Sequence, residues 1–159
     1  MKIGVIADTH LEAPSRDLER VAEEIFGDAD LVVHAGDIRS EAVLEVFAGK
    51  ELVAVRGNND AGPLGDRLPE RRVFEAAGHR IGVTHGRGWP LGLPGRVGRD
   101  FEDVDCIVFG HSHRPFNERR GGVLLFNPGA FCGGLFALGR KSVGILRVGR
   151  EIQGEIVRL

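Results

Sequence analysis

The sequence predicts an α/β fold in one domain, with a parallel sheet in its first part and a second, β-rich part packed on it. Two observations lead to this expectation. Apolar runs alternate with helical patterns over the first third of the chain, and short strand-like runs separated by Gly/Pro loops fill the rest. A chain of 159 residues can bury its own core, and no repeat or linker divides residues 1–159.

The first part has the order strand, helix, strand, helix, strand. Three runs of consecutive apolar residues are expected to be strands covered on both faces: Ile3–Ala7, Leu31–His34 and Leu52–Val55. Ser15 and Ser40 are placed to cap the two helices between them, and Gly27 and Gly49 to close those helices. Such an order predicts parallel strands joined by right-handed crossovers.

The second part changes character. Gly/Pro-rich loops are expected at Ala61–Pro69 and Gly86–Gly95, and a short helix between Arg96 and Glu102. Further strands are expected at Arg72–Ala76, Arg80–Thr84, Cys106–Phe109, Val123–Phe126, Leu135–Leu138, Ser142–Val148 and Glu151–Arg158. The first two and the last two of these runs are hairpin signals. These strands predict a second sheet packed on the first and flanked by helices.

Composition narrows the functional class. The net charge is −2, and no dense basic run or aromatic ladder indicates a nucleic-acid partner. No run approaches the roughly 18 apolar residues of a membrane span, and Asp8 interrupts the opening apolar run, so no membrane or secretory signal is expected. Cys106 is expected in the core and Cys132 partly exposed, without metal-ribbon or CxxC spacing. We therefore expect a cytoplasmic protein.

Five short polar clusters each follow an apolar run. They are Asp8-Thr9-His10, Asp37, Asn58-Asn59-Asp60, His85-Gly86 and His111-Ser112-His113. Any one of them alone is more often a turn or cap, just as His34 is expected in the core and His79 in a hairpin. Strands that end side by side bring their exit residues together, so the five clusters jointly indicate two adjacent divalent ions. A two-metal site is typical of phosphate-ester hydrolysis.

The clusters offer complementary donors. Side chains at i and i+2 share one side of a strand, so Asp8 and His10 could reach the same ion. Asp37 could bridge two ions through its two oxygens. The other donors are the carbonyl oxygen of Asn58 and the imidazoles of His85, His111 and His113. Manganese is the first expectation for both ions, and Fe, Ni, Zn or Mg also suit a mixed nitrogen and oxygen set.

The ordered motifs D-x-H, G-D, G-N-x-D, H-G and G-H-x-H resemble those of the calcineurin-like metallophosphoesterase superfamily. The short chain is similar to its small bacterial and archaeal phosphodiesterase branch, over residues 1 to about 130. The resemblance implies a four-layer αββα sandwich of two mixed sheets with the site at the strand ends. It also implies that the turn Asn127-Pro128-Gly129 lies close to that site.

The resemblance further implies an assignment of ligands. The first metal ion would be held by Asp8, His10, Asp37 and His113, and the second by Asp37, Asn58, His85 and His111. The mechanistic hypothesis is in-line attack on phosphorus by a hydroxide that bridges the two ions. The expected substrate is a small phosphodiester or nucleotide-like molecule. The sequence does not give the oligomeric state, although relatives often assemble into dimers or larger homo-oligomers.

Residues beside the ligands carry further expectations. Many family members have His where this chain has Asn59, which cannot act as a general acid, and the small phosphodiesterase branch typically lacks that His. Asn59 is expected at the substrate, and Asp60 is expected to orient Asn58 or a ligand histidine. Trp89 is interpreted mainly as an anchor packed on the core. Four arginines flank the motifs, namely Arg39, Arg56, Arg87 and Arg114, and Arg87 and Arg114 are expected to bind substrate phosphate.

Two other functions remain open at the level of sequence. A phosphomonoesterase or phosphoprotein phosphatase would use the same metal chemistry, and Asn59 argues mildly against it. A non-catalytic scaffold, like the retromer subunit with this fold, would work through its surface. Scaffolds tend to lose metal ligands, whereas this chain has each expected one.

Overall fold

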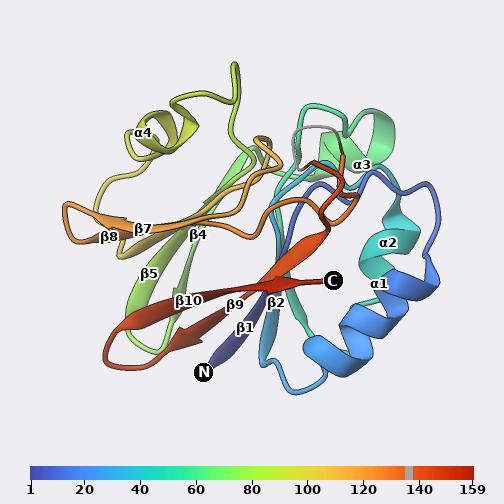
Figure 1. Cartoon of the computed structure of the whole chain (residues 1–159), viewed down its shortest axis with the longest axis horizontal. Helices are drawn as coiled ribbons and strands as arrows, with labels where there is room; N and C mark the ends of the chain where they lie inside the picture. Colours follow the sequence, from blue (N-terminus) through green and yellow to red (C-terminus); the bar gives the residue numbers. More distant parts are fainter. Residues whose placement is uncertain (135–137) are drawn as a thin grey trace.

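Two five-stranded sheets pack face to face in the computed structural model, which describes residues 1–134 and 138–159 (Figure 1). The strand order is β10-β9-β1-β2-β3 in the first sheet and β4-β5-β6-β8-β7 in the second. Both sheets are mixed, because parallel strands at the centre are joined by antiparallel strands toward the edges. The expected pair of mixed sheets is confirmed.

The first sheet is built on the predicted parallel core. Its strands are β1 (Lys2–Ile6), β2 (Leu31–His34), β3 (Glu51–Ala54), β9 (Ser142–Val148) and β10 (Ile152–Arg158). β1 pairs in parallel with β2, and β2 with β3. β9 runs antiparallel to β1 and forms the expected hairpin with β10. The carboxyl ends of β1, β2 and β3 therefore lie side by side at the same end of this sheet.

The second sheet also has a parallel core, with an antiparallel strand at each edge. Its strands are β4 (Arg71–Ala76), β5 (His79–Thr84), β6 (Cys106–Val108), β7 (Phe116–Arg120) and β8 (Val123–Asn127). β5, β6 and β8 are parallel, while β4 and β7 pair antiparallel at the two edges. β4 and β5 form the predicted hairpin.

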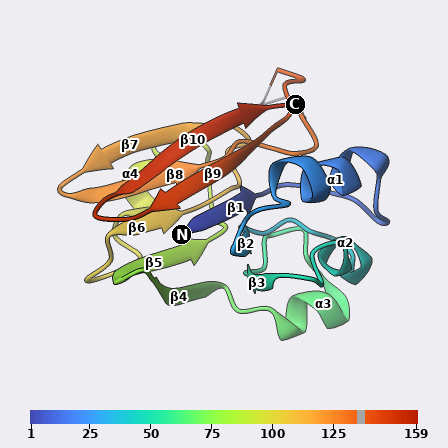
Figure 2. The same cartoon turned by 90° about the horizontal axis from the view of Figure 1, so that it is seen from below.

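Helices cover the outer faces of both sheets, which gives four layers (Figure 2). They are α1 (Arg16–Arg20), the π-helical turn η1 (Val21–Ile25), α2 (Glu41–Glu45), α3 (Gly62–Arg67) and α4 (Leu93–Val97). The views show α1, α2 and α3 beside the first sheet, and α4 on the far side of the second. In the described part of the chain, no helix combines the length and apolar character needed to cross a membrane.

Three apolar clusters correspond to the three interfaces between these layers. The largest joins inward residues of both sheets, including Val5, Val33 and Val108. A second packs Leu18 and other helix residues on the outer face of the first sheet. The third packs α4, through residues such as Leu93, on the second sheet. Alternate residues of each central strand thus face different layers, which explains why the strand sequences are apolar throughout.

The helix caps agree only partly with expectation. Ser15 caps α1 as predicted, since its hydroxyl accepts a hydrogen bond from the backbone N–H of Leu18 at 3.2 Å. Ser40 precedes α2 in extended conformation, but its side chain makes no capping hydrogen bond. Gly27 does not adopt the left-handed conformation of a closing glycine; a Cβ there would collide with the carbonyl oxygen of Glu23. Close approach of the chain, rather than turn geometry, accounts for this glycine.

Three expectations about the second part were wrong in detail. The loop predicted at Ala61–Pro69 contains α3, because Pro63 fits the first turn of a helix and Leu64 is buried against the first sheet. The short helix expected from residue 96 to 102 is α4, which begins earlier, at Leu93. Strand β7 was not predicted, because its polar, exposed sequence FNERR is stabilised by pairing with β8 rather than by burial.

One predicted strand, Leu135–Leu138, lies outside the described residues except for Leu138. That residue lies in a turn and is 78% exposed. The remaining strands agree with their predicted ranges to within one residue at each end. Most of them carry a buried apolar run, whereas β4 and β10 are largely exposed or half-buried and were found from their hairpin signals.

His34 gives the fold a testable dependence on pH. Its side chain is fully buried, and desolvation lowers its pKa from 6.5 to about 4. The unfolded chain therefore binds a proton below pH 6.5, whereas the native protein binds it only near pH 4. The contribution of His34 to the free energy of unfolding is fully present above pH 6.5. It is lost as the pH falls from 6.5 to about 4, which lowers the free energy of unfolding by about 3 kcal/mol.

Urea unfolding of the chelator-treated protein between pH 7 and pH 4.5 measures the effect. A His34→Gln variant should lose much less stability over this range than the wild type. His79→Gln, which changes a histidine at the surface hairpin, should keep most of the wild-type slope. Equal slopes for the wild type and His34→Gln would contradict the assignment.

Candidate metal centre

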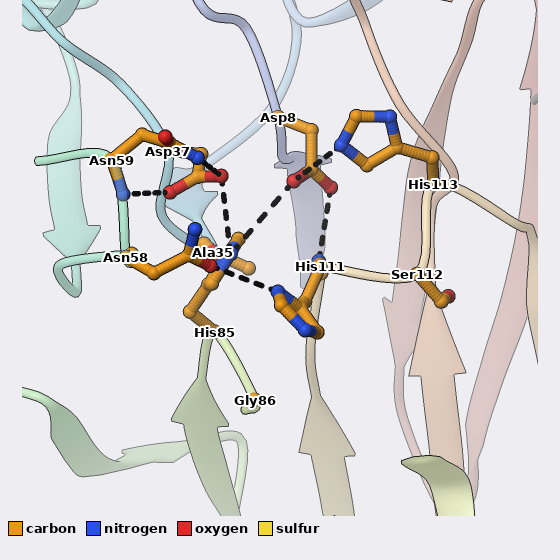
Figure 3. Close-up of polar contacts among 12 residues, drawn as sticks. Asp8, Ala35, Asp37, Asn58, Asn59, His85, Gly86, His111, Ser112 and His113 are labelled. Carbon is orange, nitrogen blue, oxygen red and sulfur yellow. Dashed lines mark hydrogen bonds and ion pairs between the residues drawn. The ribbon is translucent and has the colours of Figure 1, made fainter. Parts of the chain in front are cut away.

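The structure brings all seven expected ligands together where the two sheets meet. Asp8 and His10 follow β1, Asp37 follows β2 and Asn58 follows β3. The second sheet supplies three histidines: His85 follows β5, and His111 and His113 follow β6. Figure 3 shows the labelled carboxylates and imidazoles pointing into one space. The site thus depends on both sheets, because neither carries a complete set.

Asp8 is fully buried and lies among the histidines. Its Oδ2 accepts a hydrogen bond from the backbone N–H of His111 at 3.1 Å. Its Oδ1 lies 3.3 Å from His113 Nε2, 3.9 Å from His85 Nε2 and 4.0 Å from His10 Nε2. Among the described residues, that oxygen has no hydrogen-bond partner. A buried carboxylate oxygen in this state is a strong candidate for a cation ligand.

Asp37 lies between the histidines of the two sheets. Its Oδ2 is 3.5 Å from His10 Nε2 and 3.4 Å from His85 Nε2. Asn59 donates to both carboxylate oxygens, from its backbone N–H at 2.8 Å and from its side-chain amide at 2.7 Å. Burial opposes ionisation, but His85 and these hydrogen bonds together hold the pKa of Asp37 well below its usual range. Asp37 is therefore an anion in a central position.

The ring of His85 is oriented by the backbone. Its Nδ1–H donates to the carbonyl oxygen of Ala35 at 2.7 Å, which leaves Nε2 directed at the carboxylates and without a hydrogen-bond partner in the described part of the chain. Burial lowers the pKa of His85, but the Asp37 carboxylate, 3.4 Å from Nε2, and the charge of Asp8 reverse the shift and raise it. A backbone carbonyl that accepts from Nδ1–H fixes the tautomer with Nε2 unprotonated, which is the form that binds a metal ion.

His111 is oriented by the loop after β5. Its Nε2 lies 2.6 Å from the carbonyl oxygen of Gly88, so Nε2 carries the proton in this contact. In the neutral ring Nδ1 is then an acceptor, and it faces another acceptor, Asn58 Oδ1, at 2.9 Å. Two acceptors that face each other at this distance are expected when both are ligands of one cation.

His113 approaches His10 on the other side of the site. Their Nε2 atoms are 3.4 Å apart, and the Asp8 carboxylate, 3.3 Å from His113 Nε2, raises the pKa of His113 to about 10. The ring nitrogens of both histidines thus face the Asp8 carboxylate. A proton balances this negative charge in the metal-free protein, and a cation would replace that proton on binding.

The backbone at the site is unusual. Nine non-glycine residues in the described part have positive φ, and five are expected ligands: Asp8, His10, Asp37, His111 and His113, with φ between 50° and 66°. Left-handed backbone is costly for residues with a side chain and tends to persist where function requires it. Here it turns the chain sharply at the strand ends, which directs neighbouring donors into the same space.

Asp60 supports this backbone instead of touching a ligand side chain. Its Oδ1 accepts from the N–H groups of Ile38 and Arg39, and its Oδ2 from that of Gly57, each at 2.7 Å. The expected hydrogen bond to Asn58 or a histidine is absent from the polar contacts of the described residues. Asp60 instead fixes the loop after Asp37 to the loop after β3.

Donor chemistry and charge both fit two divalent cations. The site combines two buried carboxylates, an amide oxygen and four imidazoles, and Asp8 Oδ1 and His85 Nε2 are buried without hydrogen-bond partners in the described structure. Oxygen and imidazole donors suit Mn, Fe, Ni, Zn and Mg. One ligand atom from each of Asp8, His10 and Asp37 lies within 4.8 Å of the others, as ligands of one ion must.

A pocket of about 180 Å³ opens beside Asn58 and His85. Charged residues line it: Arg56, Arg71, Arg87, Glu70 and Asp100. Arg56 pairs with Glu70 at 2.7 Å, and Arg87 lies 4.0 Å from Asp100 with its side chain 83% exposed. Arg71 and Asp100 were not expected from sequence, because no metal motif lies next to them.

The other flanking residues lie elsewhere. Arg39 pairs with Glu12 at 2.6 Å. Arg114 lines a separate basic pocket with Arg140, Lys141 and Arg158. Trp89 is 72% exposed, so the expected anchor role was wrong; the loop is held instead by Arg96, which donates to its backbone carbonyls.

Comparisons with known proteins agree with this geometry. A sequence model of the calcineurin-like phosphoesterase superfamily domain matches residues 1–151, so the chain belongs to that family of metallophosphoesterases. A probable metallophosphoesterase of Methanothermobacter thermautotrophicus is 32% identical, with 99% of this chain and 92% of the relative covered. A phosphodiesterase of Methanocaldococcus jannaschii is 31% identical, with 99% of both chains covered.

Solved structures give the same result for the fold. An archaeal phosphodiesterase matches over the full length of both chains with a TM-score of 0.79 and 27% identity. Vps29 of Entamoeba histolytica, solved with zinc, matches over 99% of both chains with a TM-score of 0.76 and 21% identity, which shows the fold alone. The four-layer architecture of two mixed sheets is thus confirmed.

Replacing Asp60 with Asn should destabilise the site and the protein together. The amide can accept the two N–H groups at Oδ1, but its NH₂ would face the half-buried N–H of Gly57, which is left without its acceptor. Loss of charged hydrogen bonds and one unsatisfied donor predict about 2–3 kcal/mol lower stability in urea unfolding. Asp66→Asn, the same change at an exposed position of α3, should be neutral; equal losses in the two variants would contradict this role.

Proposed function

We propose that this protein is a phosphodiesterase that depends on two divalent metal ions. The observation that carries the proposal is that seven donor side chains from both sheets converge on one site. Two of their atoms, Asp8 Oδ1 and His85 Nε2, are buried without a hydrogen-bond partner in the described structure. Similarity to proteins named as phosphodiesterases supports the diester as substrate. The proposed substrate is a small phosphodiester or nucleotide-like molecule.

The proposed first metal ion is held by Asp8, His10, Asp37 and His113, and the second by Asp37, Asn58, His85 and His111. Two contacts support this division: Asp37 Oδ2 lies near both His10 and His85, and His111 Nδ1 lies beside Asn58 Oδ1. Asp37 is then the shared ligand. Its lowered pKa favours the carboxylate form that a shared metal ligand requires.

When bound, a pair of divalent ions lowers the pKa of a shared water and neutralises charge on the phosphate oxygens during in-line displacement. The chain's own residues prepare that site. Ala35 and Gly88 fix the tautomers of His85 and His111 through their carbonyl oxygens. Asn59 fixes Asp37 through two hydrogen bonds, and its expected contact with substrate stays a prediction.

A diester substrate also suits the chemistry beside the metals. The Asn59 amide is too weak an acid to serve as a general acid, so a leaving group must depart without protonation by that residue. Arg87 lines the pocket that adjoins Asn58 and His85, where a guanidinium can bind a phosphate oxygen or the group attached to it. We therefore place the substrate's non-reacting part in this pocket.

Hydrolysis of a chromogenic bis-aryl phosphate diester tests the proposal. Protein stripped by a chelator should be inactive, and added Mn²⁺ should restore turnover. Asp37→Asn should reduce turnover at least about 100-fold. Asp103→Asn is the matched control, because Asp103 is exposed and shares the left-handed backbone of Asp37, at φ 53° against 56°.

The matching monoester discriminates the alternatives. A monoester rate above the diester rate would favour a phosphomonoesterase. Stoichiometric metal binding without turnover of either ester, with each of the expected metals, would contradict the enzyme and favour a scaffold.

Arg87 provides a test of the substrate pocket. Arg87→Ala should lower kcat/KM by about tenfold without changing metal content, because it removes a phosphate-binding cation and no ligand. Arg114→Ala, expected from the sequence to act similarly, should have the smaller effect because Arg114 lines a different pocket. Arg120→Ala, on the β7 edge, is the control; unchanged kinetics for both Arg87 and Arg114 variants would refute a role in substrate binding.

A further inference from the structure

Cys132 lies beside the metal centre, next to two of its histidines. One ligand atom from each of His10, His113 and Cys132 lies within 4.8 Å of the other two. We propose that the Cys132 thiolate is an additional ligand of the ion at the Asp8, His10 and His113 side of the site, which makes that position selective for thiophilic cations. The inference rests on the proposed metal centre and concerns which metal one half of it holds.

The backbone holds Cys132 against the end of β1. The N–H of Cys132 donates to the carbonyl oxygen of Asp8 at 3.1 Å, and that of Phe131 to Ala7 at 3.0 Å. Because of these two hydrogen bonds, the segment that follows the Asn127-Pro128-Gly129 turn lies alongside the backbone of Ala7 and Asp8. The position of the thiol is therefore tied to the same backbone as the carboxylate ligand.

The thiol and the His113 ring border one small space. A Cβ built on Gly134 would lie 3.1 Å from His113 Nδ1 and 3.7 Å from Cys132 Sγ. Because residue 134 is a glycine, no side chain separates the Cys132 thiol from the His113 ring at this point. Cys132 is only partly buried, which gives a cation a route to it.

Ligand geometry supports direct coordination. Donor atoms bound to one ion at about 2.0–2.3 Å lie roughly 3–3.5 Å apart. The Nε2 atoms of His10 and His113 are 3.4 Å apart, and Asp8 Oδ1 lies 3.3 Å from His113 Nε2. Asp8 is fully buried, and its Oδ1 faces this side of the site without a hydrogen-bond partner in the described chain. With the shared carboxylate of Asp37, sulfur would complete a five-coordinate set of two oxygens, two nitrogens and one thiolate.

A thiolate changes which metals the position prefers. Soft sulfur ligands select Zn²⁺, Co²⁺ and Fe²⁺ over Mg²⁺ and Mn²⁺. The thiol loses its proton to solvent when the ion binds, so binding at this position releases more protons than binding to His and Asp alone. The expectation of manganese from the ligand motifs then holds for the Asn58 side of the site, where no sulfur is near the ligands in the described structure.

Cobalt substitution tests this directly. Chelator-stripped protein is titrated with Co²⁺, the bound metal is counted by elemental analysis, and the near-ultraviolet thiolate-to-cobalt charge-transfer band is recorded. The wild type should show the band, and Cys132→Ala should lose it. Cys106→Ala should retain it, because Cys106 is the chain's other cysteine and is fully buried, and burial raises the pKa of its thiol to about 12.

Affinity provides a second readout. Competition with a chromophoric chelator should show Zn²⁺ binding about 10–100-fold weaker in Cys132→Ala, with Mn²⁺ binding changed less than about threefold. Circular dichroism of the metal-free variants establishes that each is folded. Cys132→Ser, which keeps the size of the side chain, should also lose the charge-transfer band.

The outcomes separate this inference from the proposed function. Two bound Co²⁺ ions without a thiolate band, or a band that survives in Cys132→Ala, would overturn the role of Cys132 and leave the metal centre intact. Absence of bound metal in the folded wild type would overturn both. A Cys132 that only contacts the His113 ring would give no band and equal losses of Zn²⁺ and Mn²⁺ affinity, which also contradicts the inference.

Discussion

The burial of two carboxylates at the seam between the sheets is the constraint on which the rest of the site depends. Asp8 is fully buried and Asp37 is 2% exposed, so neither can rely on water to stabilise its charge. Isolated charges in such a place are prohibitively costly unless they are paired or bind a metal ion. The structure meets this constraint with imidazoles on every side, and their ring nitrogens face the carboxylates.

Two sheets, and not one, are needed to meet this constraint. The first sheet supplies both acids, while three of the four ligand histidines follow strands of the second. The apolar cluster between the sheets fixes how far apart they lie. It therefore sets the distance from the carboxylates of the first sheet to the imidazoles of the second. A change in that core would alter the metal centre without touching a ligand, which links packing of the fold to chemistry.

Much of this could be predicted from the sequence, for a physical reason. Buried strands require consecutive apolar residues, and a polar residue at the exit of one such run is often only a turn or a cap. Five runs that share the pattern make five independent turns or caps improbable and a common site the better interpretation. That reasoning found β1, β2, β3, β5 and β6 together with the seven donors, because the signal in each case lies within a few adjacent residues.

Features that depend on contacts across the chain were beyond such reasoning. Strand β7 is polar and owes its conformation to β8, so no local pattern marks it. The role of Asp60 lies in backbone N–H groups of another loop, and Trp89 is exposed although its size favours burial. Backbone carbonyls that orient histidines have no sequence signal, since every residue carries one.

One of those carbonyls connects the proposed substrate pocket with the proposed metal centre. Gly88 lies in the loop that borders the substrate pocket, and its carbonyl oxygen accepts from His111 Nε2 at 2.6 Å. Its φ is +79° and a Cβ there would meet no atom within 4 Å, so backbone conformation, not space, accounts for glycine at this position. A movement of this loop must either carry the His111 ring with it or break the bond that fixes its tautomer. The loop beside the proposed substrate pocket and the proposed ligand His111 are therefore mechanically coupled, and we expect occupancy of either site to restrict the other.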